Sequence, residues 1–177
     1  RMFLLQTSIL DRLSGALCDA VRFGANNMPS NSGETQDRSQ AILEHLERSN
    51  LFVIPLDDER RWYRYHHLFA GLLRQSLRRE RSDLVPTLHW RASAWYQAKE
   101  LYPDAVRHSL AAGDEERAAE LIGQEGWDML VRGEMRELLG WLDSLPQDLV
   151  SSRPQLGVIH AWALALTSRW KRLEQRL

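Results

Sequence analysis

The feature that most constrains the fold is one strand-patterned segment in the middle of a chain otherwise patterned for helices. The run 51–56, Leu-Phe-Val-Ile-Pro-Leu, and the run 61–65, Arg-Trp-Tyr-Arg-Tyr, are rich in β-branched and aromatic residues. The charged stretch Asp57-Asp58-Glu59-Arg60 separates them. Two such runs joined by a short polar turn are typical of a β-hairpin. We therefore predict one two-stranded sheet, with strands at about 52–56 and 62–65.

Helical patterns lie on both sides of this hairpin. Before it, apolar residues recur at helical steps, with a break at Gly15 between two short helices and a capping residue, Ser39, before a third. The stretch 24–38, rich in Gly, Asn and Ser, is predicted to be a surface loop. After the hairpin, another helix ends among arginines that suit the negative end of its dipole. Three helices, a wing and a fourth helix are the order of a winged-helix domain, which we place at residues 1–81.

The second half, residues 82–177, carries helical patterns only. Short amphipathic segments follow one another through turns that contain Gly or Asp, such as Gly113-Asp114. This pattern is typical of an α-α superhelical array. Pairs such as Ala118-Ala119 resemble tetratricopeptide helix pairs, without a strict repeat. The predicted fold class is therefore mainly α, with an array that is truncated at its C-terminus and whose last helix begins at Arg169.

Tryptophan is concentrated in this helical half. Most of the seven tryptophans are expected to pack between helices, and some to line a concave surface. They are Trp62, Trp90, Trp95, Trp127, Trp141, Trp162 and Trp170.

Composition excludes several classes of function. The net charge of −1 gives no general attraction to nucleic acid or anionic membranes. The single cysteine, Cys18, excludes an intrachain disulfide framework, and no apolar run approaches the length of a membrane span. With no export signal visible, we expect a cytoplasmic protein. The chain starts at Arg1 rather than Met, so we expect it to be a piece of a larger protein.

No catalytic constellation is present in the sequence. Neither a GxSxG nucleophile elbow nor a GxxxxGK[ST] phosphate-binding loop occurs. His89, His108 and His160 fall on separate predicted helices and are interpreted as structural. We therefore expect this chain to be no enzyme by itself and to hold no cofactor or metal of its own.

The segment from Leu51 to Phe69 resembles the MalT-like branch of the LuxR-type transcriptional activators, which are ATP-dependent regulators of the STAND class. The stretches Ser8–Leu13 and Ala111–Asp114 agree with that family on either side. The resemblance implies that the parent protein has a nucleotide-binding domain and a helical domain before the winged helix. It also implies a helical sensor array and a DNA-binding helix-turn-helix after it. This chain would be the winged helix and the start of the array.

The resemblance also implies a site at His66. STAND proteins carry a Met-His-Asp motif in the winged helix, at the start of a helix, whose His contacts the β-phosphate of bound ADP and holds the inactive state. Tyr65-His66-His67 is similar, with Tyr65 and His67 where the family has Met and Asp. An imidazole N–H can donate to a phosphate oxygen. The alternative from the residues alone is a polar helix start, in which one His caps the helix and the other is solvated.

DNA binding by this chain is not expected. The predicted third helix, Gln40–Ser49, would be the recognition helix of a DNA-binding winged helix. It carries Glu44 and Glu47 against His45 and Arg48, and the wing tip carries acids at 57–59, with Arg60 and Arg61 adjoining them. Acids on these surfaces repel the phosphates that supply most non-specific affinity. We therefore predict no direct contact with nucleic acid.

Two functions from different classes stay open. The first is a regulatory segment of a MalT-like regulator, a nucleotide-state switch with a sensor arm. Its partners would be the neighbouring nucleotide-binding and helical domains, with ADP or ATP in the full-length parent and an inducer molecule or protein on the array. The second is a free-standing helical scaffold for protein–protein interaction. The hairpin and the pattern Tyr65-His66-His67 favour the first, because a plain scaffold needs no wing.

Overall fold

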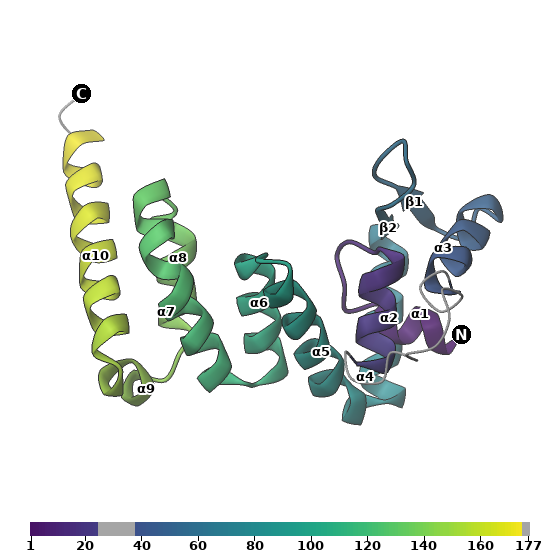
Figure 1. Cartoon of the computed structure of the whole chain (residues 1–177), viewed down its shortest axis with the longest axis horizontal. Coiled ribbons are helices and arrows are strands. Elements are labelled where there is room, and N and C mark those ends of the chain that lie inside the picture. Colours follow the sequence, from purple (N-terminus) through teal and green to yellow (C-terminus); the bar gives the residue numbers. More distant parts are fainter. Residues whose placement is uncertain (25–37, 175–177) are drawn as a thin grey trace. The chain divides into compact units, whose positions relative to one another are not determined.

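The computed structural model describes residues 1–24 and 38–174, with side chains up to residue 167 (Figure 1). The chain divides into two compact units, Arg1–Ala98 and Lys99–Leu177. Residues 25–37 of the predicted surface loop lie outside the described residues.

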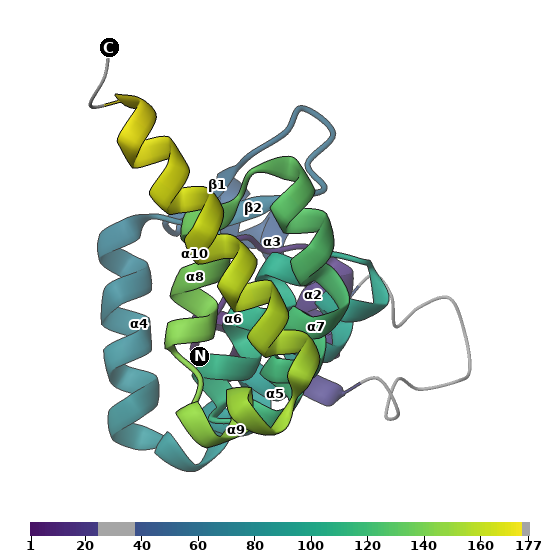
Figure 2. The same ribbon diagram turned by 90° about the vertical axis from the view of Figure 1, so that its left-hand side faces the viewer.

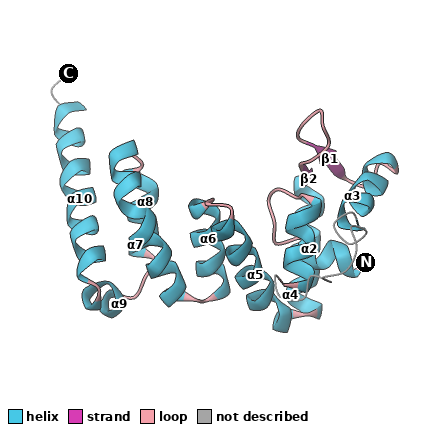
Figure 3. Ribbon diagram, viewed as in Figure 1, coloured by secondary structure: helices cyan, strands magenta, loops and turns pink. Residues whose placement is uncertain are grey.

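The described part of the first unit consists of helices and one hairpin. Its elements are α1 (Met2–Thr7), α2 (Gly15–Phe23), α3 (Arg38–Arg48), β1 (Val53–Pro55), β2 (Tyr63–Tyr65), α4 (His67–Glu80), the 3-10 helix η2 (Ser82–Leu84) and α5 (Val85–Ala98). The strands are antiparallel, with Val53 opposite Tyr65 and Pro55 opposite Tyr63. Figure 3 shows β1 and β2 as the strands of the described chain. The prediction of one hairpin after three helices is confirmed.

The loop between α1 and α2 differs from the prediction of two adjoining helices. Ser14 caps α2, because its side chain accepts a 3.3 Å hydrogen bond from the Leu17 N–H, so Gly15 begins the helix. Leu13 is buried but not helical. Its N–H and C=O exchange 2.8 Å hydrogen bonds with Tyr63, forming an isolated β-bridge to the hairpin. The backbone of residue 13 therefore pairs with the wing and cannot continue a helix.

The sequence predicted that Ser39 caps α3, but the structure shows that it does not. The helix begins at Arg38, and the buried Ser39 hydroxyl donates to Asp19 Oδ1 at 2.5 Å. Arg22 Nη1 in turn donates to Ser39 Oγ at 3.2 Å. Ser39 thus lies within the first turn of α3, where its hydroxyl bridges the Asp19 carboxylate and the Arg22 guanidinium. Cys18, beside Asp19, is fully buried, as predicted for a small core residue.

Helix α5 packs against α2 within the first unit. Arg91 Nη1 donates to the carbonyls of Val21 at 3.2 Å and Arg22 at 2.7 Å. These belong to the last carbonyls of α2, which have no partner inside their own helix. The compact division consequently falls after Ala98, whereas the domain boundary after residue 81 stays a prediction.

The second unit is described as helices in an array. They are α6 (Tyr102–Ala112), α7 (Glu115–Arg132), α8 (Met135–Asp143), α9 (Gln147–Ser152) and α10 (Pro154–Glu174). Helix α7 packs on α6 and α8, and α10 packs on α7, α8 and α9. Gly113 and Gly133 end α6 and α7 in the left-handed conformation, at φ 75° and 81°. A mainly α chain with a hairpin followed by a helical array is confirmed.

Helix α10 and the tryptophans correct two details of the array. A new helix was predicted from Arg169, but α10 continues through this position, because 166–169 contains neither Gly nor Pro to end it. Trp141 is buried as predicted. Trp127 and Trp162 are instead 43% and 51% exposed, so they are not fully covered by neighbouring helices.

Candidate functional site at the start of helix α4

The hairpin positions His66 between strand β2 and helix α4. Its backbone N–H donates to the Phe52 carbonyl at 2.8 Å, and its carbonyl accepts from the Ala70 N–H at 2.9 Å. The first bond ties it to the residue before β1, and the second is the first bond of α4. Both backbone groups of His66 are therefore held, and its imidazole is the part that can contact something else.

Tyr65 fixes the residue before His66 to the first helix. Its side chain is buried, and its hydroxyl lies 2.7 Å from Thr7 Oγ1. The Thr7 hydroxyl donates its one proton to the Phe3 carbonyl at 2.8 Å, so Tyr65 must be the donor in the pair. Burial raises the pKa of Tyr65, which keeps this donor protonated.

An aromatic cluster also packs around the start of α4. Phe69, on the first turn of α4, contacts Phe52 at 5.1 Å and Tyr65 edge-on at 5.8 Å between ring centroids. Phe52 has a φ of +58°, a left-handed conformation that a bulky residue seldom adopts. Its bond to the His66 N–H and its contact with Phe69 hold it there. The structure thus accepts local strain beside the predicted site.

The two imidazoles have different exposure. His66 is half-buried, His67 is exposed, and their ring centroids lie 4.5 Å apart with a 33° tilt. Neither ring makes a hydrogen bond or ion pair within the described part of the chain, and His66 does not cap α4 through its side chain. The alternative with one capping His does not describe this helix start. The His66 ring nitrogens are thus left for a ligand or for solvent.

Metal ligation has no support in the described residues. Over residues 1–24 and 38–167, no group of three or more His, Cys, Asp or Glu side chains is placed to hold a metal ion. His66 and His67 alone supply two nitrogens on adjacent residues, fewer than a structural or catalytic zinc site uses.

Arg74 fixes the middle of α4, a role the sequence did not reveal. Its Nε donates to the Ser8 carbonyl at 2.7 Å, and its Nη2 pairs with Asp11 Oδ1 at 2.7 Å. The sequence counted Arg74 among the cations that suit the helix dipole. The structure uses it to hold the loop after α1, because that loop leaves its carbonyls outside any helix.

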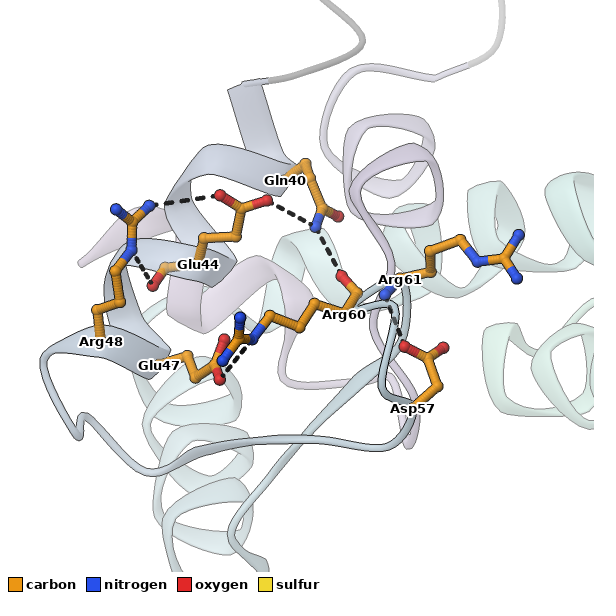
Figure 4. Close-up of polar contacts among 7 residues, drawn as sticks. All are labelled: Gln40, Glu44, Glu47, Arg48, Asp57, Arg60 and Arg61. Atoms are coloured by element: carbon orange, nitrogen blue, oxygen red, sulfur yellow. Dashed lines mark hydrogen bonds and ion pairs between the residues drawn. The ribbon is translucent and has the colours of Figure 1, made fainter.

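The third helix and the wing tip form a mixed ion-pair network (Figure 4). Glu44 accepts from Arg48 at 3.3 Å, and Glu47 pairs with Arg60 of the wing at 3.1 Å. Gln40 Nε2 also donates to the Arg60 carbonyl at 2.8 Å, which joins α3 to the wing. Glu44 and Glu47, the helix acids predicted to repel DNA, are therefore matched by arginines.

The wing tip acid nearest to β1 has a structural role. Asp57 accepts from the backbone N–H of Arg61 at 2.8 Å (Figure 4). It also accepts from the backbone N–H of Trp62 at 3.2 Å, and the two bonds close the turn. The expectation that this chain does not contact DNA stays a prediction. The reason for this prediction changes, however. Repulsion by the glutamates is reduced by their pairing, but the arginines that pair with them on α3 and the wing are already engaged.

None of the described helices combines the length and the hydropathy that crossing a bilayer requires.

Comparison with known proteins identifies relatives over the whole chain. Residues 1–85 match the family described as MalT winged helix domain. The chain is 37% identical over 169 residues to the serine/threonine-protein kinase PknK of Mycobacterium tuberculosis, covering 96% of this chain and 14% of that protein. It is 33% identical over 177 residues to the HTH-type transcriptional regulator MalT of Yersinia pestis, covering 100% of this chain and 18% of that protein. The chain therefore spans less than a fifth of the length of either relative.

Proposed function

We propose that this chain, whose first 85 residues are a MalT winged helix domain, is a regulatory segment of a larger signalling protein. In this proposal the winged helix reads the nucleotide state of the parent protein. The helical array after it is the start of a sensor arm. The segment itself performs no catalysis, and the parent is a cytoplasmic, MalT-like regulator of the LuxR family.

The observation that carries this proposal is the combination of a fixed backbone and an unengaged ring at His66. Hydrogen bonds to Phe52 and Ala70 hold its backbone, and Tyr65 is anchored to Thr7. A residue whose backbone is held in this way loses no further backbone freedom when its ring binds a ligand, which lowers the entropic cost of the hydrogen bond. A half-exposed imidazole at a domain surface suits a contact with an anion held by a neighbouring domain.

The anion in this proposal is a phosphate of ADP, held mainly by a nucleotide-binding domain outside this chain. The chain lacks a phosphate-binding loop, so it contributes one donor, the His66 N–H, to a site built elsewhere. The residues present fit that limited role. A contact made only in the ADP-bound state shifts the parent toward its resting form, since a ligand moves an equilibrium only through differential affinity.

The relatives support a switch that is separate from the output. One carries the name of a transcriptional regulator and the other that of a protein kinase, and both contain this segment at similar identity. A segment shared by a transcriptional regulator and a protein kinase is suited to controlling the activity of the protein, rather than to DNA binding or phosphate transfer. The alternative is a helical interaction scaffold, but it gives no reason for the hairpin or for the positioning of His66.

The test is the output of the full-length parent without its activating signal. His66→Ala should raise basal output, whereas His67→Ala, on the exposed neighbour, should leave it near the wild-type level. Circular dichroism on both variants checks that they fold. Equal basal output in the two well-folded variants would contradict a switch role for His66 and favour the helical interaction scaffold.

A further inference from the structure

Arg64 lies on the same outward face of the hairpin as His66. Along β2 the side chains of Tyr63 and Tyr65 are buried, and that of Arg64 between them is exposed. Side chains alternate between the two faces of a strand. The bond from the His66 N–H to the Phe52 carbonyl continues the antiparallel pairing beyond Tyr65. His66 therefore follows Arg64 on the outward face, with their Cα atoms about 7 Å apart.

Arg64 is a cation without a counter-ion in the part of the chain that the structure describes. Its guanidinium makes no hydrogen bond or ion pair there. The residue directly across the hairpin, Ile54, is apolar and half-buried, so it offers no acceptor. Other arginines near it in the sequence are paired with acids: Arg60 with Glu47, Arg61 with Glu59, and Arg74 with Asp11. The fold thus leaves the Arg64 charge free beside the unengaged His66 ring.

The arrangement of these two donors indicates the kind of anion that they fit. A guanidinium offers a planar fork of N–H groups that matches two oxygens of one phosphate. An imidazole offers a single N–H in one direction. Two donors that stand side by side on one strand suit an anion with oxygens on two neighbouring centres. A diphosphate has this form, because its two phosphorus atoms share one oxygen and each carries oxygens of its own.

We propose that Arg64 is a second donor to the diphosphate of ADP, beside His66. The inference rests on the proposed function, since that function supplies the nucleotide from a neighbouring domain. It adds a residue that brings a full positive charge to the site, whereas His66 brings one directed hydrogen bond. The wing of this chain then recognises the anion through two adjacent side chains of one strand end.

The ADP affinity of the full-length parent tests this role. Arg64→Gln removes the charge and the fork of donors but keeps a polar side chain. It should weaken ADP binding about tenfold to a hundredfold, the effect of losing a charge-assisted hydrogen bond. Binding of adenosine, which has no phosphate, should stay at the wild-type level. Circular dichroism checks that the variant folds.

Arg78→Gln provides the matched control. Arg78 is also exposed and also makes no ion pair among the described residues, but it lies in the last turn of α4. Twelve residues of helix place it about 18 Å from His66 along the axis. The substitution changes the net charge as Arg64→Gln does, and it should leave ADP binding near the wild-type level.

Three results would overturn the inference. The first is an unchanged ADP affinity in well-folded Arg64→Gln. The second is an equal loss in Arg78→Gln, which would be an effect of net charge. The third is an equal loss for adenosine, which would mean that Arg64 holds the neighbouring domain and not the phosphates. An affinity lowered by His66→Ala but not by Arg64→Gln would remove Arg64 alone and leave the proposed function standing, whereas two unchanged affinities would remove both.

Discussion

The Tyr65 hydroxyl donates to Thr7 Oγ1 across 2.7 Å, which joins the residue before His66 to the first helix of the chain. The Thr7 hydroxyl donates its own hydrogen bond to the Phe3 carbonyl, so the Tyr65–Thr7 bond has a defined direction. This buried bond connects α1 with strand β2, two residues before α4 begins. The position of His66 therefore depends on residues nearly sixty positions earlier in the sequence.

The direction of this bond predicts unequal effects for two conservative substitutions. Thr7→Val leaves the buried Tyr65 hydroxyl without an acceptor and should cost about 1–3 kcal/mol of unfolding free energy. Tyr65→Phe removes the donor, while Thr7 keeps its bond to Phe3, so it should cost about 0.5–1.5 kcal/mol. Urea unfolding of both variants measures the difference. Equal costs would mean that the donor has been assigned to the wrong residue.

Asp19 predicts a pH dependence of stability. It is 2% exposed, and burial raises the pKa of its carboxyl above the ordinary value of 3.8, against the opposing effects of the Ser39 hydrogen bond and the Arg22 charge. A raised folded-state pKa favours folding below pH 3.8, and this contribution is lost as the pH rises through the folded-state pKa. Ionised Asp19 is thus less favourable in the folded than in the unfolded chain.

Asp19→Asn removes this titration while keeping an oxygen to accept from Ser39. The variant should gain stability relative to the wild-type chain as the pH rises from about 4 to about 7, because only the wild-type chain must bury a charge at residue 19. Urea unfolding at several pH values measures the difference. A difference that is flat with pH, or that falls, would contradict the raised pKa of Asp19.

Two glycines of α7 predict opposite effects of the same substitution. A Cβ at Gly126 would lie 3.0 Å from Ile159 Cδ1 on α10, whereas one at Gly123 would find its nearest atom at 3.7 Å. Gly126→Ala should destabilise the second unit by about 1–3 kcal/mol through overpacking. Gly123→Ala should stabilise it by about 0.5–1 kcal/mol, because Ala favours the helix. Thermal unfolding of both variants is the measurement, and stabilisation by Gly126→Ala would show that α10 adjusts to the added methyl group.

The sequence predicted the elements whose pattern extends over several residues. The hairpin was visible because two runs of β-branched and aromatic residues flank a charged turn. Most helices were visible because their apolar residues recur at helical steps. The bridge between Leu13 and Tyr63 was not, because a single pair of residues leaves no period and uses only backbone groups. The role of Arg91 was also hidden, since an arginine that bonds to the end of a distant helix looks like any surface arginine.

The sequence predicted the position of the candidate site but not the contacts that hold it. The motif similarity located His66 at a helix start, where the structure has it. Sequence patterns could not reveal that its backbone is bonded to Phe52, or that Phe52 adopts a left-handed conformation to accept that bond. The engagement of Glu47 was hidden for the same reason: its partner Arg60 lies across a turn thirteen positions away. The pair Glu44–Arg48 is instead a local one, with the two residues one helical turn apart on α3.

The most direct test of this account is the ADP affinity of the full-length parent with His66→Ala, measured beside His67→Ala. A charge-assisted hydrogen bond to a phosphate is worth about 1.5–3 kcal/mol. Its loss should weaken ADP binding about tenfold to a hundredfold in His66→Ala. His67→Ala should bind ADP like the wild type. An unchanged ADP affinity in a well-folded His66→Ala protein would contradict the account and return His66 to an ordinary residue at a helix start.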